Sequence, residues 1–462
     1  MRPTTWRRST HVVIGLAVLA IVAAVVVVAA LVTSGGQSTS TAQAAKPQPA
    51  LATAQPGITA VAESAPTPAP NRLAATLAPF VADPNLGTLT GRVTDAITGA
   101  QLWAQGAGVP MQPASTNKVL TTAAALLTLD RNATLSTTVL TDPDTPGLLI
   151  LKGGGDPTLS AAAPGQPTWY KGAARISDLV TQVRDAGVAV TAVQVDTSAF
   201  SGPTMAPGWD ATDIEGGDIA PIESVMLDGG RTQPVSVESQ RSPTPALDAG
   251  RALAVAFGAN PAAVTALPTT PATAKKIAEV QSPPLIERLR QMMSESDNVM
   301  AESVGREVAA AVDRPQSFDG GVQAVLGQLR KGGIDTAAAT LVDSSGLSVN
   351  DRLTALTLDE VVNAAAGDEH PELRPLLDLL PIAGGSGTLS NRFIDTPAGL
   401  AAAGLLRAKT GSLTGTNALA GIVTDAAGRV LTFSLISNNA GPTGRTSIDA
   451  LAATLQSCGC GS

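Results

Sequence analysis

The sequence predicts an α+β fold in which one antiparallel sheet combines strands from both ends of the globular part. At its start, residues 89–93 and 101–105 have the alternation of strands and follow a helical apolar pattern. At its end, three apolar segments are separated by turn residues, and the apolar period between the two ends is helical. The C-terminal strands are expected at 404–409, 418–423 and 430–437, and the helices at 282–312, 316–331 and 356–365.

A change of texture predicts a large inserted, β-rich region between residues 142 and 276. Short strand candidates, 148–152 and 190–195, lie there among many Gly and Pro residues. We therefore expect one main domain formed by residues 71–141 and 277–462, with one or more domains inserted at 142–276.

The first 33 residues predict a cytoplasmic stub and a transmembrane anchor. Residues 12–32 are apolar and uncharged, and roughly 20 such residues cross a bilayer core as a helix. Arg2, Arg7 and Arg8 precede this run, so the positive-inside rule places the N-terminus in the cytoplasm and the rest of the chain outside. Cleavage near Ala42-Gln43-Ala44, which would give a secreted protein, is the alternative.

Residues 34–70 predict a disordered linker. They are rich in Ala, Pro, Ser and Thr and nearly lack large apolar side chains. Such a segment cannot bury enough surface to fold, so we expect it to act as a tether.

Composition excludes several classes of function. The net charge of −8 and an aromatic content of 2% argue against a nucleic-acid surface, which needs basic patches and stacking platforms. His11, His370, Cys458 and Cys460 are too few for a structural zinc site, so we expect no metal and no cofactor. The C-terminal cysteines are equally compatible with an intermolecular bridge and with free thiols, and the oligomeric state is not predicted.

Ser115-Thr116-Asn117-Lys118 is the first candidate for chemistry. Ser115 precedes a helical run, so backbone N–H groups and the helix dipole favour negative charge beside it. Lys118 lies three residues later on the same helix face, and a buried lysine with a lowered pKa can act as a general base. The alternative is a helix cap followed by a solvated lysine.

Two further motifs change the balance between these readings. Ser296-Asp297-Asn298 predicts a loop between helices that presents a hydroxyl and an amide, although a helix N-cap is the alternative. Lys409-Thr410-Gly411-Ser412 ends a predicted strand and offers a cation and a hydroxyl to a carboxylate. Chance would supply all three motifs together about 0.003 times, so a catalytic set is favoured.

The ordered motifs S-x-x-K, S-D-N and K-T-G are typical of class A β-lactamases and penicillin-binding proteins, and the sequence resembles that superfamily. It is most similar to the class C low-molecular-mass penicillin-binding proteins, the D-alanyl-D-alanine carboxypeptidase and endopeptidase family, over residues 71–439. This family carries extra domains between its first two motifs. Further stretches resembling it are Gly153-Gly154-Gly155-Asp156-Pro157-Thr158-Leu159, Ser282-Pro283-Pro284-Leu285, Asp343-Ser344-Ser345-Gly346-Leu347-Ser348 and Gly387-Thr388-Leu389.

The resemblance implies a serine β-lactamase/transpeptidase-like domain with an antiparallel five-stranded sheet, and a serine D,D-peptidase that acts on peptidoglycan stem peptides. Ser115 would attack the carbonyl between two D-alanines while Lys118 takes its proton, giving an acyl-enzyme. The backbone N–H groups of Ser115 and Ser412 would stabilise the oxyanion. β-Lactam antibiotics would acylate Ser115 and inhibit the protein.

The remaining motif residues receive roles from the same resemblance. Ser296 would relay a proton to the leaving amine, and Asn298 would hold the substrate backbone. Lys409 and Thr410 would bind the terminal carboxylate beside Gly411. Carboxypeptidase and endopeptidase activities share this chemistry, and the sequence does not choose between them.

Two rival functions are carried alongside. A Ser-His-Asp hydrolase would have to use His370, because it is the only histidine outside the membrane region, and its polar surroundings predict a surface loop. A catalytically silent wall-binding or scaffold protein would keep the fold without turnover. The complete set of Ser115, Lys118, Ser296 and Lys409 argues against the silent protein.

Overall fold

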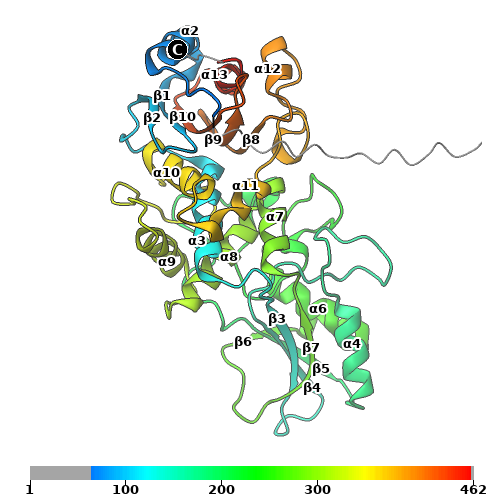
Figure 1. Ribbon diagram of the computed structural model, residues 1–462. Coiled ribbons are helices and arrows are strands. Elements are labelled where there is room, and N and C mark those ends of the chain that lie inside the picture. Colours follow the sequence, from blue (N-terminus) through cyan, green and yellow to red (C-terminus); the bar gives the residue numbers. More distant parts are fainter. Residues whose placement is uncertain (1–63, 459–462) are drawn as a thin grey trace, which may run out of the picture. The chain divides into compact units, whose positions relative to one another are not determined.

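Both ends of the described chain meet in one antiparallel sheet, as the sequence predicts (Figure 1). The computed structural model describes residues 64–458. The first strand pairs with the last over its whole length, with Thr88 opposite Asn438 and Asp95 opposite Leu431. The predicted α+β class is therefore confirmed. Across the sheet lie β2 (Gln101–Gln105), β1 (Thr88–Asp95), β10 (Val430–Asn438), β9 (Thr416–Thr424) and β8 (Leu406–Leu413).

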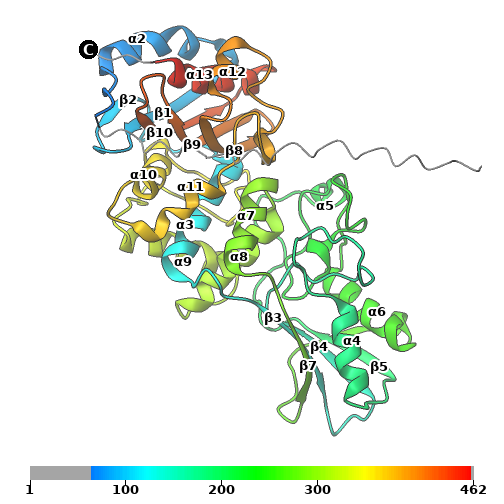
Figure 2. The ribbon, with the colours of Figure 1, turned by 45° about the vertical axis from the view of Figure 1, so that its right-hand side comes forward.

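Hydrophobic cores cover both faces of this sheet. On one face, Leu77, Phe433 and Leu451 belong to a core shared with the terminal helices. On the other, Leu120 and Leu358 belong to a larger helical core, and the site lies between this core and the edge strand β8. The first face carries α2 (Pro70–Val81), α12 (Pro397–Ala402) and α13 (Gly444–Ser457), and the second carries α3 (Lys118–Thr128), α7 (Leu285–Glu295), α8 (Asn298–Ala311), α9 (Phe318–Lys331), α10 (Ala355–Ala366) and α11 (Pro375–Leu379) (Figures 1 and 2).

The helical segment expected at 282–312 consists of two helices with the second motif at the break between them, as the sequence predicts. Ser296 ends α7 with a φ of 57°, in the left-handed region, and the Asp297 side chain accepts a hydrogen bond from Met300 N at 2.9 Å, which caps α8. The second motif therefore forms both the sharp turn between the helices and the start of α8.

A second, mixed sheet lies in the inserted region, covered by α4 (Ile176–Asp185) and α6 (Pro245–Phe257), with the short α5 (Thr212–Gly216) in a loop between them (Figure 2). The strands in order across this sheet are β6 (Thr265–Leu267), β5 (Ala192–Asp196), β4 (Leu148–Gly153), β3 (Ser136–Thr141) and β7 (Lys275–Gln281). The strands β4, β5 and β6 run parallel to one another, and β3 pairs antiparallel with both β4 and β7.

The predicted bounds of the insert, 142 and 276, fall inside this second sheet. β3 precedes residue 142 and most of β7 follows residue 276, yet the two strands pair with each other, with Ser136 opposite Gln281. We therefore propose that the inserted region runs from about 135 to 282. The division into 71–141, 277–462 and 142–276 had assigned these strands to the main domain.

The predicted anchor at residues 12–32 and most of the predicted linker at 34–70 lie outside the described residues. Within residues 64–458, no helix has both the length and the apolar character that a membrane crossing requires. Near the other end of the chain, Cys458 takes part in a disulfide. Free thiols, one of the two alternatives left open by the sequence, are therefore wrong for Cys458.

Candidate active site

Ser115 lies on a short 3₁₀ turn, η2 (Ala114–Asn117), that leads directly into α3. The turn begins with Ala114 at a φ of 48°, an unfavourable conformation for alanine. Thr116 fastens the turn by donating its hydroxyl to Pro113 O at 2.7 Å. From the sheet side, a Cβ on Gly411 would lie only 2.6 Å from that same carbonyl, so glycine allows β8 to approach the serine closely.

The Lys118 ammonium is fully buried and donates to three oxygens. Its Nζ lies 3.0 Å from Ser115 Oγ, 2.6 Å from Asn298 Oδ1 and 2.8 Å from Ser345 O. An ammonium has three donor protons, so each one has an acceptor. The predicted proximity of Ser115 and Lys118 is present, and the acceptor at Ser345 was not foreseen.

Burial lowers the pKa of Lys118 from its ordinary value of 10.5 to about 8. The carboxylates of Asp343, Asp297, Glu302 and Asp218 oppose this shift by stabilising the charged form. The neutral amine is therefore accessible near neutral pH, as a general base requires.

Ser296 and Asn298 come together with Ser115 as predicted, from the break between α7 and α8. Asn298 points its amide oxygen at Lys118 and donates its Nδ2 to Asp218 O at 2.9 Å. Asp218 belongs to the inserted region, so this asparagine joins the insert to Lys118. The middle residue of the motif, Asp297, accepts a hydrogen bond from Tyr170 Oη at 2.7 Å.

Lys409 approaches the same centre from β8. Its Nζ donates to Ser296 Oγ and to Thr410 O, both at 2.9 Å. Burial, with the charges of Lys118 and Arg392 nearby, lowers the pKa of Lys409 well below its ordinary value. The hydroxyl of Thr410 contacts that of Thr388 at 2.8 Å. The strand continues to Leu413, so the motif lies inside β8. From the sequence, the motif was expected at the end of this strand.

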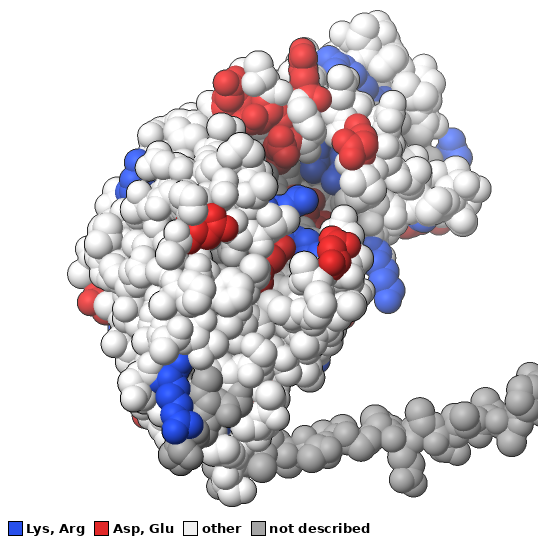
Figure 3. All heavy atoms as spheres, turned by 90° about the horizontal axis from the view of Figure 1, so that it is seen from above, with Lys and Arg blue, Asp and Glu red and all other residues white. Residues whose placement is uncertain are grey.

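A cleft of about 740 Å³ opens over these groups, lined by Ser115, Ser296, Asn298, Thr410 and Ser412. Seen from above, acidic and basic side chains gather around a hollow in the surface (Figure 3). Sequence reasoning missed the charged lining, because only the fold brings these segments together. The charged residues are Asp210, Asp213, Asp218, Glu295, Arg392 and Arg445.

His370 does not join the cleft. Its Nδ1 lies 3.1 Å from Glu372 Oε1, in a short polar segment that follows α10. The cavity that it borders is separate from the one lined by Ser115, so a Ser-His-Asp set is not assembled. Within residues 64–458, no group of three or more His, Cys, Asp or Glu side chains is placed to hold a metal ion.

Family models cover nearly the whole chain. The model described as the D-Ala-D-Ala carboxypeptidase 3 (S13) family matches residues 73–242 and 234–457. A second model, the N-terminal domain of Rv3627c-like carboxypeptidases, matches residues 1–60, where the anchor and part of the linker are predicted.

Individual proteins agree with these matches. The chain is 71% identical to carboxypeptidase DacB of Mycolicibacterium smegmatis over 461 residues, 100% of both chains. It is 31% identical to the D-alanyl-D-alanine carboxypeptidase of Actinomadura sp., over 81% of this chain and 82% of that one. The crystal structure of penicillin-binding protein 4 from Haemophilus influenzae has the same fold, with a TM-score of 0.67 and 24% identity over 84% of this chain and 98% of the other.

Proposed function

Because the chain belongs to the D-Ala-D-Ala carboxypeptidase 3 (S13) family, we propose that Ser115 is the nucleophile with which this serine carboxypeptidase cleaves D-Ala-D-Ala bonds in peptidoglycan stem peptides. One observation carries this assignment. A buried lysine with a pKa of about 8 lies 3.0 Å from a serine hydroxyl at the floor of a cleft. That pair is what an acyl-enzyme mechanism without histidine requires.

Acylation begins with proton transfer from Ser115 Oγ to the neutral Lys118 amine. The oxygen attacks the carbonyl carbon between the two D-alanines, and the carbonyl π electrons move to its oxygen. The backbone N–H groups of Ser115 and Ser412 are the proposed donors to that oxyanion, and in other enzymes one such donor contributes about 2.7–4 kcal/mol. Ser412 occupies β8 opposite Asn417 of β9, which gives its N–H a rigid support.

Collapse of the tetrahedral intermediate expels the terminal D-alanine, whose nitrogen needs a proton. Ser296 Oγ is the proposed relay, because it accepts a hydrogen bond from Lys409 Nζ at 2.9 Å. The proton that leaves the Ser296 hydroxyl for the amine is replaced, across the cleft, by the proton that Lys118 took from Ser115, so Lys118 is neutral again. Water then attacks the acyl-enzyme and gives a proton to Lys118, and collapse of the second tetrahedral intermediate releases Ser115, whose oxygen takes that proton back.

Recognition of the substrate is proposed to divide between the two sides of the cleft. On the strand side, Lys409, Thr410 and Ser412 offer a cation and hydroxyls to the terminal carboxylate, and Gly411 keeps the strand close to Ser115. On the helical side, the Asn298 amide keeps one N–H and one lone pair for the backbone of the stem peptide, beside its bonds to Lys118 and Asp218 O. A β-lactam has a strained amide and a carboxylate in the same relation, so we propose that β-lactams acylate Ser115.

Cleavage of cross-links is included in the proposal as the same reaction with a larger leaving group. In a carboxypeptidase the leaving amine is free D-alanine, whereas in an endopeptidase it belongs to a neighbouring peptide strand. The cleft is open enough at about 740 Å³ to be compatible with both. Digestion of purified peptidoglycan, followed by mass analysis, separates the shortening of pentapeptides from the conversion of dimers to monomers.

Attachment to the cell membrane through residues 12–32 also belongs to the proposal. The apolar run without charge and the three preceding arginines support a single-pass anchor with an external catalytic domain, while cleavage near Ala42 to Ala44 would give a secreted protein. Fractionation of cells that express the full chain tests this, because an anchored chain remains with the membrane after a salt wash.

Labelling with a fluorescent penicillin tests the nucleophile. We expect a covalent adduct on the wild-type protein, located on Ser115 by peptide mass analysis, and no adduct on Ser115→Ala. A catalytically silent wall-binding protein would leave both proteins unlabelled. His370→Ala serves as the matched control, because loss of labelling there with retention in Ser115→Ala would favour the histidine hydrolase.

A further inference from the structure

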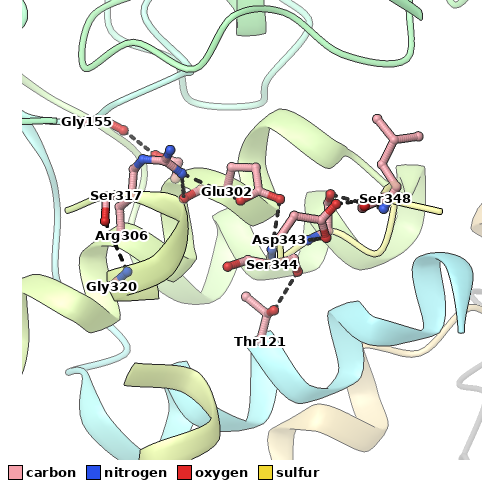
Figure 4. A network of polar contacts seen from close by, with 12 residues as sticks. Thr121, Gly155, Glu302, Arg306, Ser317, Gly320, Asp343, Ser344 and Ser348 are labelled. Carbon is pink, nitrogen blue, oxygen red and sulfur yellow. Dashed lines mark hydrogen bonds and ion pairs between the residues drawn. The ribbon is translucent and has the colours of Figure 1, made fainter. Parts of the chain in front are cut away.

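The buried turn 343–348 is organised around one carboxylate (Figure 4). Asp343 is fully buried and accepts four N–H donors. Within the turn, its Oδ1 accepts from Ser345 N at 3.1 Å and Gly346 N at 2.6 Å, and its Oδ2 accepts from Ser348 N at 2.7 Å. The fourth donor is Trp209 Nε1, at 2.8 Å from Oδ2, and comes from the inserted region. A carboxylate with four such donors fixes the path of both segments.

One side of this turn faces the nucleophile and its base. Ser345 O accepts from Lys118 Nζ at 2.8 Å, and Asp343 O accepts from Asn117 Nδ2 at 3.1 Å. Figure 4 shows Thr121 of α3 directed at Ser344, whose carbonyl accepts its hydroxyl at 2.6 Å. These contacts reach the first helical turn of α3, which begins with Lys118. The turn 343–348 therefore determines where Lys118 finds its third acceptor, the Ser345 carbonyl.

The other side of the turn faces the insert. Ser348 Oγ donates to Pro207 O at 2.7 Å, next to the Trp209 contact with Asp343. Between these two contacts, Gly208 has a φ of 84°, and a Cβ there would lie 2.6 Å from Ser348 Oγ. Gly208 and Asp210 line the cleft, so the contacts to the turn determine where this wall of the cleft stands.

We propose that Asp343 is a positioning residue. It keeps the Ser345 carbonyl within hydrogen-bond distance of Lys118 and, through Trp209, it keeps the part of the cleft wall that the insert forms in contact with the turn 343–348. The proposal rests on the proposed roles of Ser115 and Lys118. It gives the insert a part in the reaction: the loop at 207–210 is fastened to the residue that orients the base.

The charges around Lys118 add a measurable signature. Four carboxylates raise its pKa against the effect of burial, with Asp343 first, followed by Asp297 and Glu302 of α8 and Asp218 of the insert, while the Lys409 ammonium of β8 acts in the opposite sense. Removing the negative charge of Asp343 therefore lowers the pKa of Lys118. The neutral amine is then present at lower pH, and the rising part of the pH profile moves with it.

The decisive variant is Asp343→Asn, which keeps the size of the side chain but removes its charge and replaces one acceptor oxygen with a donor. We expect kcat/KM for a D-Ala-D-Ala peptide to fall about 10²-fold, as for a base displaced from its working position. We also expect the midpoint of the rising limb to move about one pH unit lower. A residue with only a structural role would lower the rate at every pH and leave the midpoint in place.

Asp351→Asn is the matched control. Burial and the neighbouring Asp343 carboxylate raise the pKa of Asp351 well above its ordinary value, and Asp351 is not one of the four carboxylates that raise the pKa of Lys118. Its Oδ1 accepts from Val342 N at 2.8 Å, a contact that the asparagine oxygen can keep. The midpoint should therefore stay within about 0.2 pH units of wild type, since the four carboxylates that act on Lys118 are unchanged.

Trp209→Phe tests the arm that reaches the insert. It removes the indole N–H but keeps an aromatic ring against Phe318, which the indole contacts edge to face at 5.1 Å. Asp343 retains its three donors within the turn, so kcat should change less than twofold and the midpoint should not move, whereas KM should rise about fivefold for the loss of one hydrogen bond. This variant keeps the test decisive even where Asp343→Asn fails to fold.

Three results would overturn the proposal. They are unchanged kinetics in Trp209→Phe, a pH midpoint in Asp343→Asn that matches wild type, and a midpoint in Asp351→Asn that shifts as far as the midpoint in Asp343→Asn. Failure of the underlying mechanism has a different appearance. In that case Ser115→Ala still takes up penicillin label, or the wild-type protein takes up none, whatever the Asp343 variants do.

Discussion

The two walls of the cleft hold their lysines in different ways. On the helical wall, Lys118 has three oxygen acceptors and lies within reach of four carboxylates. On the strand wall, Lys409 has two acceptors, and the charges that act on it are both cationic, Lys118 and Arg392. Both ammonium groups are fully buried, so burial alone does not distinguish the two walls.

We infer that this difference separates a base, Lys118, from a carboxylate receptor, Lys409. Lys118 has its partners within the protein, and a pKa of about 8 allows it to gain and lose a proton near neutral pH. Burial and two neighbouring cations disfavour the charged form of Lys409, and an anion brought by the substrate would stabilise that form. The same residue type therefore serves two functions, according to whether the protein or the substrate supplies the opposite charge.

The largest expected effect comes from exchanging each lysine for methionine. We expect Lys118→Met to lower the acylation rate about 10²- to 10⁴-fold, the usual contribution of a general base. The loss should be equal for a D-Ala-D-Ala peptide and for the same peptide with a terminal carboxamide. Lys409→Met should lose much more on the carboxylate than on the carboxamide, and stopped-flow acylation of both probes measures the difference. Equal losses for the two lysine variants on both probes would contradict the division of the walls.

The next effect is the dependence of acylation on pH. Only the neutral form of Lys118 accepts a proton, so the rate should rise with pH to a plateau with a midpoint of about 8. Two units below that midpoint the rate should be about 10²-fold lower. The carboxamide probe is used, because its binding does not depend on the charge of Lys409. A profile that is flat between pH 6 and pH 9 would remove Lys118 from the role of base.

The walls should also differ in stability. Lys409→Met removes a buried amine whose charged form is disfavoured by two neighbouring cations, whereas Lys118→Met leaves Ser345 O without its donor and takes the counter-charge from the buried Asp297. We expect Lys409→Met to have the higher free energy of unfolding at pH 7, by about 2 kcal/mol. Urea unfolding of both variants measures this difference, and the reverse order would show that Asp297 does not depend on Lys118.

The sequence predicted what depends on local spacing. Ser115 and Lys118 could be paired because three residues along a helical turn bring two side chains together, and their contact is present at 3.0 Å. The strands of the first sheet were found because alternating apolar residues lie between turn residues, as at 430–437, where β10 runs from Val430 to Asn438.

The features that the sequence could not predict depend on which strands and turns, distant in the sequence, become neighbours in the fold. A strand has the same pattern whichever sheet it joins, so the sequence assigned β3 and most of β7 to the main domain, although they pair with each other in the second sheet. The strand predicted at 404–409 ended at Lys409, but pairing of Gly411 with Ala418 continues β8. The stretch Gly387-Thr388-Leu389 was recognised, while its contact with Thr410 required the fold.

That contact gives the smallest effect and the finest test of the strand wall. Thr410 Oγ1 donates to Thr388 Oγ1 at 2.8 Å, which orients the hydroxyl beside Lys409. Thr388→Val removes this acceptor at nearly the same volume, and one hydrogen bond of about 1 kcal/mol corresponds to about a fivefold rise in KM for the D-Ala-D-Ala peptide. The carboxamide peptide should be unaffected, and kcat should stay the same for both, because Lys118 and its three acceptors lie on the other wall. If instead KM rises equally for both peptides, the threonine pair acts on the shape of the cleft and not on the carboxylate.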